Sequence, residues 1–187
     1  MRQIESAEKK EKKEKKKQQI LSGILIFVLV FSIAGYATFS GTSKEKDNQR
    51  TYNGLSFNLE NGFWKTTINE KELVFFNLPY DLENISIKMD KIFSDYNEKP
   101  LYFVGNYPST IPYNLDGIPI RMQNACVDNH SCLDNSLPIK NCSEDNILIF
   151  IESNESKIYQ EENCIYLEGD LMEVSDKFIY NLLGIEL

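Results

Sequence analysis

The residues of this 187-residue chain best suited to chemistry are its cysteines and its single histidine. The cysteines are Cys126, Cys132, Cys142 and Cys164. An even number of cysteines confined to one part of a chain predicts disulfides, provided that this part faces an oxidising compartment. Of the three possible pairings we favour Cys126–Cys132, which closes a small loop, and Cys142–Cys164, which joins two predicted strands. The longer bridge would contribute about 3 kcal/mol by loop entropy.

His130 lies between Cys126 and Cys132 and leaves two other kinds of site open. A zinc site would use thiolates and this imidazole, but the cysteines are separated by five, nine and 21 residues, without a Cys-x-x-Cys pair. Zinc sites usually have closer ligand pairs. A Cys/His pair could also act as nucleophile and base. A surface histidine in a disulfide-tied loop is the commoner situation, so we predict no metal and no cofactor.

Carboxylates near predicted loops form the second set of candidates: Asp116, Asp128, Asp134, Asp145 and Asp170. Any two of them could meet in space and act as an acid/base pair. Solvated acidic loops are far commoner, and the sequence does not single out one pair. The chain has no Gly-x-Ser-x-Gly, Walker loop, Gly-x-Gly-x-x-Gly or His-Glu-x-x-His motif. We therefore assign no catalytic residue.

Surface recognition and modification are the remaining chemistry that the sequence indicates. Asn-x-Ser sequons place possible glycan acceptors at Asn84, Asn129, Asn141 and Asn154. Tyrosines near predicted loops could form a recognition patch: Tyr52, Tyr107 and Tyr113. More often, such tyrosines are partly buried packing residues.

The domain that must position these residues opens with a predicted hairpin. Apolar residues alternate with polar ones on both sides of Asn61-Gly62, a pair that favours a type I′ turn. A two-residue loop pairs position 59 with 64, 57 with 66 and 55 with 68, which puts these side chains on one face. A third strand at 73–78 completes a three-stranded meander.

Further elements alternate between strands and helices. Strands are predicted at 85–89, 101–104, 146–152, 157–159 and 164–167. A helix is predicted at 116–127, with Asp116 as its N-cap and Ile118, Met122 and Ala125 at helical spacing. The final helix is capped by Asp170 and Glu173 and ends at Gly184. This order predicts an α+β or α/β fold with a mainly antiparallel sheet.

An apolar run near the N-terminus predicts a transmembrane helix. No charged residue occurs from 18 to 43, and residues 20–39 would span roughly 30 Å as a helix. Lysines precede the run, so we expect the N-terminus in the cytoplasm. The small residues around 35–37 leave a cleaved signal peptide open, although an uncleaved signal anchor fits the long charged leader better. The expected parts are a tail at 1–18, a span at 19–40, a linker at 41–51 and a disulfide-stabilised outer domain at 52–187.

The net charge of −8 is divided unevenly along the chain. Residues 1–18 carry eight basic and four acidic side chains, whereas the remainder carries twelve basic and twenty-four acidic ones. An acidic outer domain argues against a nucleic-acid partner, because phosphate binding needs a basic face.

Four stretches near the C-terminus resemble a group of small single-pass membrane-anchored archaeal proteins with a four-cysteine outer domain: LPIKNC, DNILIFIES, IYQEENCIYLEGD and DKFIYNLLGI. The resemblance covers roughly residues 52–187. It implies that the strands near Cys142 and Cys164 belong with the final helix, and it brings no activity. We expect a binding or structural module of the cell surface, with the bilayer and a surface protein or glycan as partners. The alternative is an anchored extracytoplasmic hydrolase that uses carboxylates or a Cys/His pair.

Overall fold

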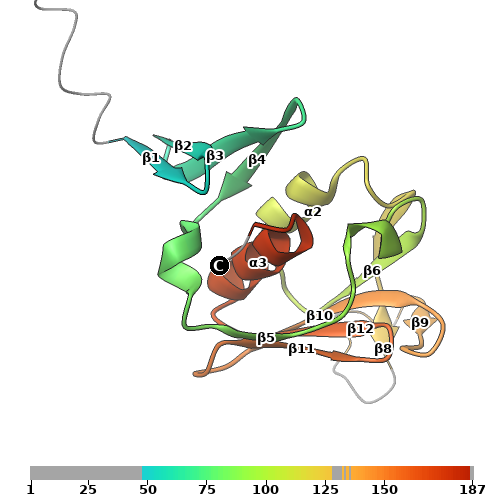
Figure 1. Ribbon diagram of the computed structural model, residues 1–187. Helices are drawn as coiled ribbons and strands as arrows, with labels where there is room; N and C mark the ends of the chain where they lie inside the picture. The colour runs from blue at the N-terminus through green and yellow to red at the C-terminus, as the bar shows by residue number, and fades with distance from the viewer. Residues whose placement is uncertain (1–47, 128–131, 133, 135, 186–187) are drawn as a thin grey trace, which may run out of the picture. The chain divides into compact units, whose positions relative to one another are not determined.

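The computed structural model describes residues 48–127, 132, 134 and 136–185 (Figure 1). The predicted tail and membrane span lie outside these residues, as do most of the linker, Asn129 and His130. Within the described ranges, no helix is both long and apolar enough to cross a bilayer. Residues 48–187 form one unit, which holds every element below.

A four-stranded antiparallel sheet, here called the meander sheet, opens the domain. Its strands, in spatial order, are β1 (Gln49–Tyr52), β2 (Leu55–Glu60), β3 (Phe63–Ile68) and β4 (Lys71–Phe75). Asn61 and Gly62 both have positive φ, and Leu59 pairs with Trp64, so the predicted hairpin is confirmed. The sheet has one more strand than predicted, because β1 pairs with β2 where we expected the end of the linker.

The larger sheet has six strands in the order β5-β11-β12-β10-β6-β7. They are β5 (Ser86–Lys88), β6 (Pro100–Val104), β7 (Arg121–Asn124), β10 (Asn146–Glu152), β11 (Lys157–Glu161) and β12 (Cys164–Gly169). Only the β11–β12 ladder is antiparallel, and the other four are parallel. The expectation of mainly antiparallel pairing therefore holds for the meander sheet and is wrong for this one. Its central strands are continuous apolar runs, as in parallel sheets that are covered on both faces.

The predicted helix at 116–127 is wrong. The helix in this region, α2 (Thr110–Leu115), ends before Asp116, and β7 follows. Gly117 turns the chain with a φ of 76°, and Pro119 lacks the N–H that a helix interior needs. The spacing of Ile118, Met122 and Ala125 resembles one apolar face of a helix. In the structure these side chains do not share a face, because Ile118 and Met122 pack on one side of the larger sheet and Ala125 packs on the other. Beyond it, β8 (Cys126–Val127) pairs with β9 (Ile139–Lys140).

The last helix, α3 (Leu171–Leu182), is capped at both ends. The Asp170 side chain accepts hydrogen bonds from the backbone N–H groups of Met172 and Glu173, as predicted. The predicted cap by Glu173 is wrong, because its carboxylate accepts from the Ser156 hydroxyl at 3.3 Å and the Asp170 N–H donates to that hydroxyl instead. Gly184 has a φ of 70°, and the N–H groups of residues 184 and 185 donate to the carbonyls of 181 and 180. That pair of bonds is a Schellman motif, which confirms Gly184 as the helix end.

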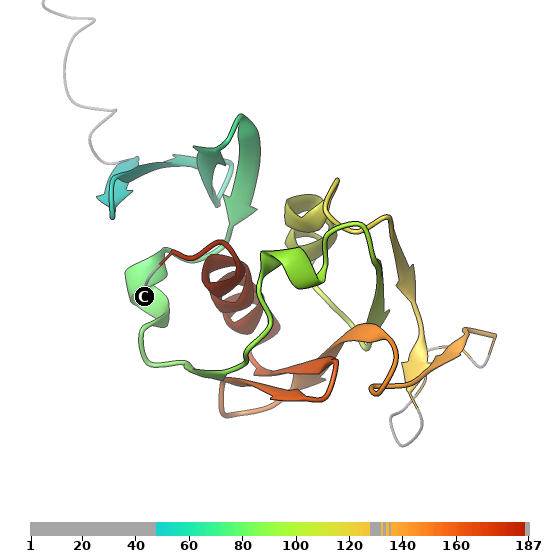
Figure 2. The same cartoon turned by 45° about the vertical axis from the view of Figure 1, so that its right-hand side comes forward.

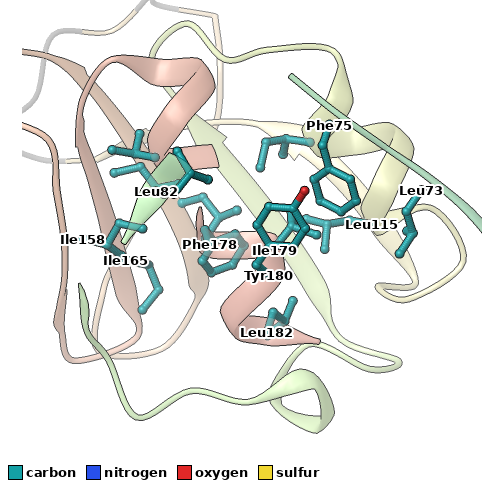
Figure 3. Packing of buried hydrophobic residues seen from close by; sticks show 14 of the residues in the cluster. Leu73, Phe75, Leu82, Leu115, Ile158, Ile165, Phe178, Ile179, Tyr180 and Leu182 are labelled. Atoms are coloured by element: carbon teal, nitrogen blue, oxygen red, sulfur yellow. The ribbon is translucent and has the colours of Figure 1, made fainter. Parts of the chain in front are cut away.

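Helix α3 lies between the meander sheet and the larger sheet in both views (Figures 1 and 2). Two 3₁₀ helices, η1 (Pro79–Leu82) and η2 (Phe93–Asp95), lie on the path from β4 to β6. The main core gathers side chains from both sheets around the helix, and several of them are labelled in Figure 3. The rings of Phe75 and Tyr180 stack with centroids 4.2 Å apart. The helix thus shares one apolar core with both sheets.

The opposite face of the larger sheet carries a second, smaller core. Tyr102, Val104, Ile147 and Ile149 belong to it, together with Cys164. The structure contains the disulfides Cys126–Cys132 and Cys142–Cys164, the pairing that the sequence favoured. The second bridge ties the segment before β10 to the first residue of β12, and so fixes the neighbouring ends of two central strands.

Polar side chains of α3 hold the chain where it leaves β4, an arrangement that we call the α3 clamp. One oxygen of Asp176 accepts hydrogen bonds from the backbone N–H groups of Phe76 and Asn77, both at 2.8 Å, and from the Asn77 side chain at 3.1 Å. The Tyr180 hydroxyl donates to the Asn77 carbonyl at 2.8 Å. The clamp therefore provides hydrogen-bond partners for backbone groups of a partly buried segment that has left the sheet.

Helix α2 secures the outer edge of β4 by a similar device. The buried side chain of Asn114 accepts from the backbone N–H of Val74 at 2.9 Å and donates to the carbonyl of the same residue at 2.7 Å. This amide replaces a neighbouring strand at an edge that would otherwise expose pairing groups. The Lys71 ammonium donates to the carbonyl oxygens of Asn114 and Asp116 and draws the end of α2 onto the start of β4.

The clamp contains a buried acid. Asp176 is 1% exposed, and burial raises the pKa of its carboxyl to about 7, although the hydrogen bonds from Asn77 and Phe76 oppose the rise. A carboxyl whose pKa is higher in the folded chain binds more protons there than in the unfolded chain. Its contribution to stability is fully present below about pH 4 and is lost as the pH rises through 7.

Replacing Asp176 by Asn should remove this pH dependence while keeping an oxygen acceptor for the clamp. We compare the free energy of unfolding of the unsubstituted chain with that of the Asp176→Asn variant. The value for the unsubstituted chain should fall relative to the variant's by up to about 4 kcal/mol as the pH rises from 4 to 8. Denaturant titrations of both chains at several pH values measure the difference. A difference that stays flat with pH would contradict the assignment.

Candidate functional site

Three of the acidic residues singled out in the sequence have carboxylates engaged in local structure. Asp116 instead contributes its backbone carbonyl oxygen, which accepts from the Lys71 ammonium. Asp145 accepts from the Lys140 ammonium and from the Asn141 N–H, both at 3.2 Å. Asp134 accepts from the Ser136 N–H at 2.8 Å, a bond that lowers the pKa of its carboxyl. Asp170 caps α3. These carboxylates stabilise turns and a helix end; Asp128 lies outside the described residues.

All four cysteines are joined in disulfides. In this state they supply neither the thiolates of a zinc site nor a cysteine nucleophile. Across the described part of the chain, no group of three or more His, Cys, Asp or Glu side chains is placed to hold a metal ion.

A cluster of cations surrounds one buried phenol on the second face of the larger sheet. Arg121 donates to the Tyr102 hydroxyl at 2.6 Å, and the Lys140 ammonium lies 4.2 Å from the centre of the same ring. The hydrogen bond from Lys140 is the main cause that lowers the pKa of Tyr102. This cluster links side chains of β7 and β9 to β6, and because Tyr102 is buried it presents no reactive phenol to solvent.

A cleft of about 650 Å³ lies where the parallel strands β6, β10 and β12 end. Its apolar lining side chains are Phe76, Tyr107, Pro108, Leu171 and Met172. Its polar lining side chains are Asn106, Ser109, Glu152, Ser153 and Asp170. The carboxyl ends of parallel strands are the usual place for a ligand in α/β proteins, and the volume is ordinary for a ligand site. We take this cleft as the candidate functional site.

Two glycines allow the strand ends to converge at the cleft. Gly105 follows β6 with a φ of 92°, and a Cβ there would lie 2.5 Å from the Phe150 carbonyl oxygen. Gly169 ends β12 with a φ of 128°, and a Cβ there would overlap Ser156. Both positions need a residue without a side chain, for backbone conformation and for space.

The walls of the cleft are fixed by contacts behind them. The Tyr107 ring packs on Phe103 with centroids 4.7 Å apart, and its hydroxyl donates to the Asn124 side chain at 2.7 Å. Phe76 packs on Phe63 with centroids 5.0 Å apart, and its backbone N–H belongs to the α3 clamp. These contacts form the site before any ligand arrives, which lowers the entropy cost of binding.

The lining of the cleft divides by polarity, and we call its apolar side chains the floor and its polar side chains the rim. Met172 is 49% exposed although it is apolar, and Leu171 beside it is half-buried. Of the described side chains that line the cleft, the charged ones are Glu152 and Asp170, both acidic. The site therefore combines an exposed apolar surface with negative charge.

Sequence reasoning found few of these residues. It singled out Asp170 as a cap and Tyr107 as a possible recognition residue, and both line the cleft. Tyr52 and Tyr113 are not among its lining residues. The glycines were missed, although a glycine directly after an apolar strand is a signal that could have found them. The sequon residues Asn84, Asn141 and Asn154 are exposed, and Asn154 directly follows Ser153 of the cleft.

Substitution of the two strand-end glycines by alanine tests how the cleft is built. We expect Gly105→Ala and Gly169→Ala each to destabilise the fold by on the order of 3 kcal/mol, because strain and overlap add. Gly117→Ala is the matched control, with positive φ but open space around its Cβ, and should cost about 1 kcal/mol. Equal losses for all three variants in denaturant titrations would show that the close approaches are unimportant.

Comparison with protein-family models, with curated proteins and with solved structures finds no match to this chain. The resemblance to membrane-anchored archaeal proteins stays a prediction. The functional interpretation therefore rests on the geometry of the cleft and on the sequence pattern.

Proposed function

We propose that this chain is a single-pass, membrane-anchored binding module whose outer domain holds a ligand in the cleft at the ends of β6, β10 and β12. The observation that carries the proposal is the exposed apolar floor of that cleft. Met172 and Leu171 begin α3, beside a rim of hydroxyl and carboxylate groups. An exposed apolar surface rimmed by polar residues is typical of an interaction site.

Binding accounts for the cleft better than hydrolysis does. Its two carboxylates are Glu152 and Asp170, and one Asp170 oxygen already accepts two N–H groups of α3. A general base also needs a nucleophile or a water position within hydrogen-bond reach. Ser109 and Ser153 line the cleft, but among the described contacts neither hydroxyl bonds to either carboxylate. We therefore infer recognition of a surface protein, a glycan or a smaller ligand.

The outward placement is inferred from the chain as a whole. The lysine-rich tail and the apolar run at 19–40 support an inner N-terminus and an uncleaved anchor. The two disulfides fit an oxidising compartment. The net negative charge of the outer domain argues against a nucleic-acid partner, because phosphate binding needs a basic face.

A single introduced thiol tests placement and binding together. We expect Met172→Cys, in intact cells expressing the full chain, to react with a membrane-impermeant maleimide without reductant, because position 172 is exposed in the cleft. The reaction should be slower on cells than on the purified chain, since the cell's own ligand shields the cleft. Labelling rates are read from the mass shift of the chain.

Tyr80→Cys is the control, because Tyr80 is exposed on η1 and does not line the cleft. Its labelling rate should be the same on cells and on purified chain. Labelling of both thiols only after lysis would overturn the outward placement. Equal rates for position 172 on cells and in purified form would overturn ligand binding in the cleft.

A further inference from the structure

We propose that the cleft takes an extended peptide segment in which a large apolar side chain stands beside a lysine or arginine. The inference rests on the proposed binding function and names the chemistry of its ligand. It follows from three features of the cleft: the apolar floor, the sign of the charge at the rim, and the state of the α3 N-terminus.

The floor sets the need for an apolar side chain. Tyr107 and Pro108 come from the loop after β6, whereas Leu171 and Met172 come from the first turn of α3. Removing such surface from water favours binding of an apolar group. Met172 adds an adaptable side chain that fits apolar groups of different shapes.

The rim sets the sign of the ligand's charge. Glu152 ends β10 and pairs with Gly169 of β12, and Asp170 follows Gly169, so the two acidic residues bring negative charge to neighbouring strand ends. No Lys, Arg or His is among the described lining residues. A cation on the ligand would be attracted to both carboxylates, whereas a phosphate or carboxylate would be repelled. A lysine or arginine beside the apolar group satisfies this requirement.

The N-terminus of α3 does not reverse that preference. A helix N-terminus attracts anions through its free N–H groups. Here the N–H groups of Met172 and Glu173 already donate to Asp170, at 2.9 and 3.3 Å. The Asp170 N–H donates to the Ser156 hydroxyl at 3.2 Å. The internal carboxylate thus occupies the place of an anionic ligand, which disfavours a nucleotide or a phospholipid headgroup.

An extended peptide fits the arrangement of the lining better than a lone amine does. The apolar residues come from three segments: the loop after β6, the start of α3, and Phe76 after β4. Glu152 and Ser153 come from β10 and the turn after it. A cleft of about 650 Å³ holds several side chains. A chain that alternates a cationic and an apolar residue can reach the floor and the rim together.

Four short peptides with blocked ends test the inference on the full chain: Gly-Lys-Phe-Lys-Gly, Gly-Gln-Phe-Gln-Gly, Gly-Glu-Phe-Glu-Gly and Gly-Lys-Gly-Lys-Gly. The readout is the NMR shift of the Met172 methyl group, titrated to give a dissociation constant. We expect the Lys-Phe-Lys peptide to bind about fivefold more tightly than the Gln-Phe-Gln peptide at low salt, with a smaller ratio at high salt. The peptide without phenylalanine and the acidic peptide should bind most weakly.

Variants of the rim locate the effect. Glu152→Gln should weaken the Lys-Phe-Lys peptide about fivefold, and Asp170→Asn, which can still cap α3, should also weaken it. Glu144→Gln, at an exposed acid that does not line the cleft, should leave the dissociation constant unchanged. A loss of affinity with Glu144→Gln equal to that with Glu152→Gln would overturn the site assignment.

The possible failures are distinguishable. Equal affinity for the cationic and neutral peptides, or tighter binding of the acidic one, would show that the cleft does not select a cationic peptide. The proposed binding function of the cleft would still stand. The ligand class would also be overturned if none of the peptides shifted the Met172 methyl while position 172 remained shielded on cells. Absence of both peptide shifts and shielding would overturn the ligand class and the proposed function together.

Discussion

The α3 clamp is the interaction on which the rest of the structure depends. Asp176 and Tyr180 hold the N–H and carbonyl groups of the chain just after β4, the point where the meander sheet is joined to the remainder of the domain. The connection from β4 to η1 spans residues 76–78, and four hydrogen bonds to its first two residues prevent it from swinging freely. The stacked Phe75 and Tyr180 rings add apolar contact at the same place. The clamp therefore fixes the meander sheet against α3 and also fixes Phe76, one wall of the cleft.

The cleft is formed where the strands of the larger sheet end beside α3. Parallel strands bring their carboxyl ends to one edge, so the loop after β6, the turn after β10 and the start of α3 meet there. Gly105 and Gly169 allow the backbones to approach closely enough for the loops to form continuous walls. Asp170 caps α3 and places negative charge at the rim, so one side chain contributes to both the fold and the character of the site.

Local signals in the sequence predicted elements whose causes are local. The Asn61-Gly62 turn, the 146–152 strand and the ends of α3 at Asp170 and Gly184 follow from turn chemistry, apolar runs and capping residues, and each is present. The β1–β2 turn at Asn53-Gly54 carried the same turn signal and was overlooked. Parallel pairing could not be predicted, because it depends on strands far apart in the chain. The α3 clamp joins residues about 100 positions apart, and no local pattern marks such a pair.

Native-state hydrogen exchange of the full chain tests the central role of the clamp most directly. If the clamp fixes the meander sheet to the rest of the domain, the amides of Phe76 and Asn77 open only when the whole domain unfolds. Their free energies of exchange should then equal that of Leu148 at the centre of β10. Exchange of these two amides through a smaller opening, while Leu148 stays protected, would show that the meander sheet detaches by itself and would contradict the account.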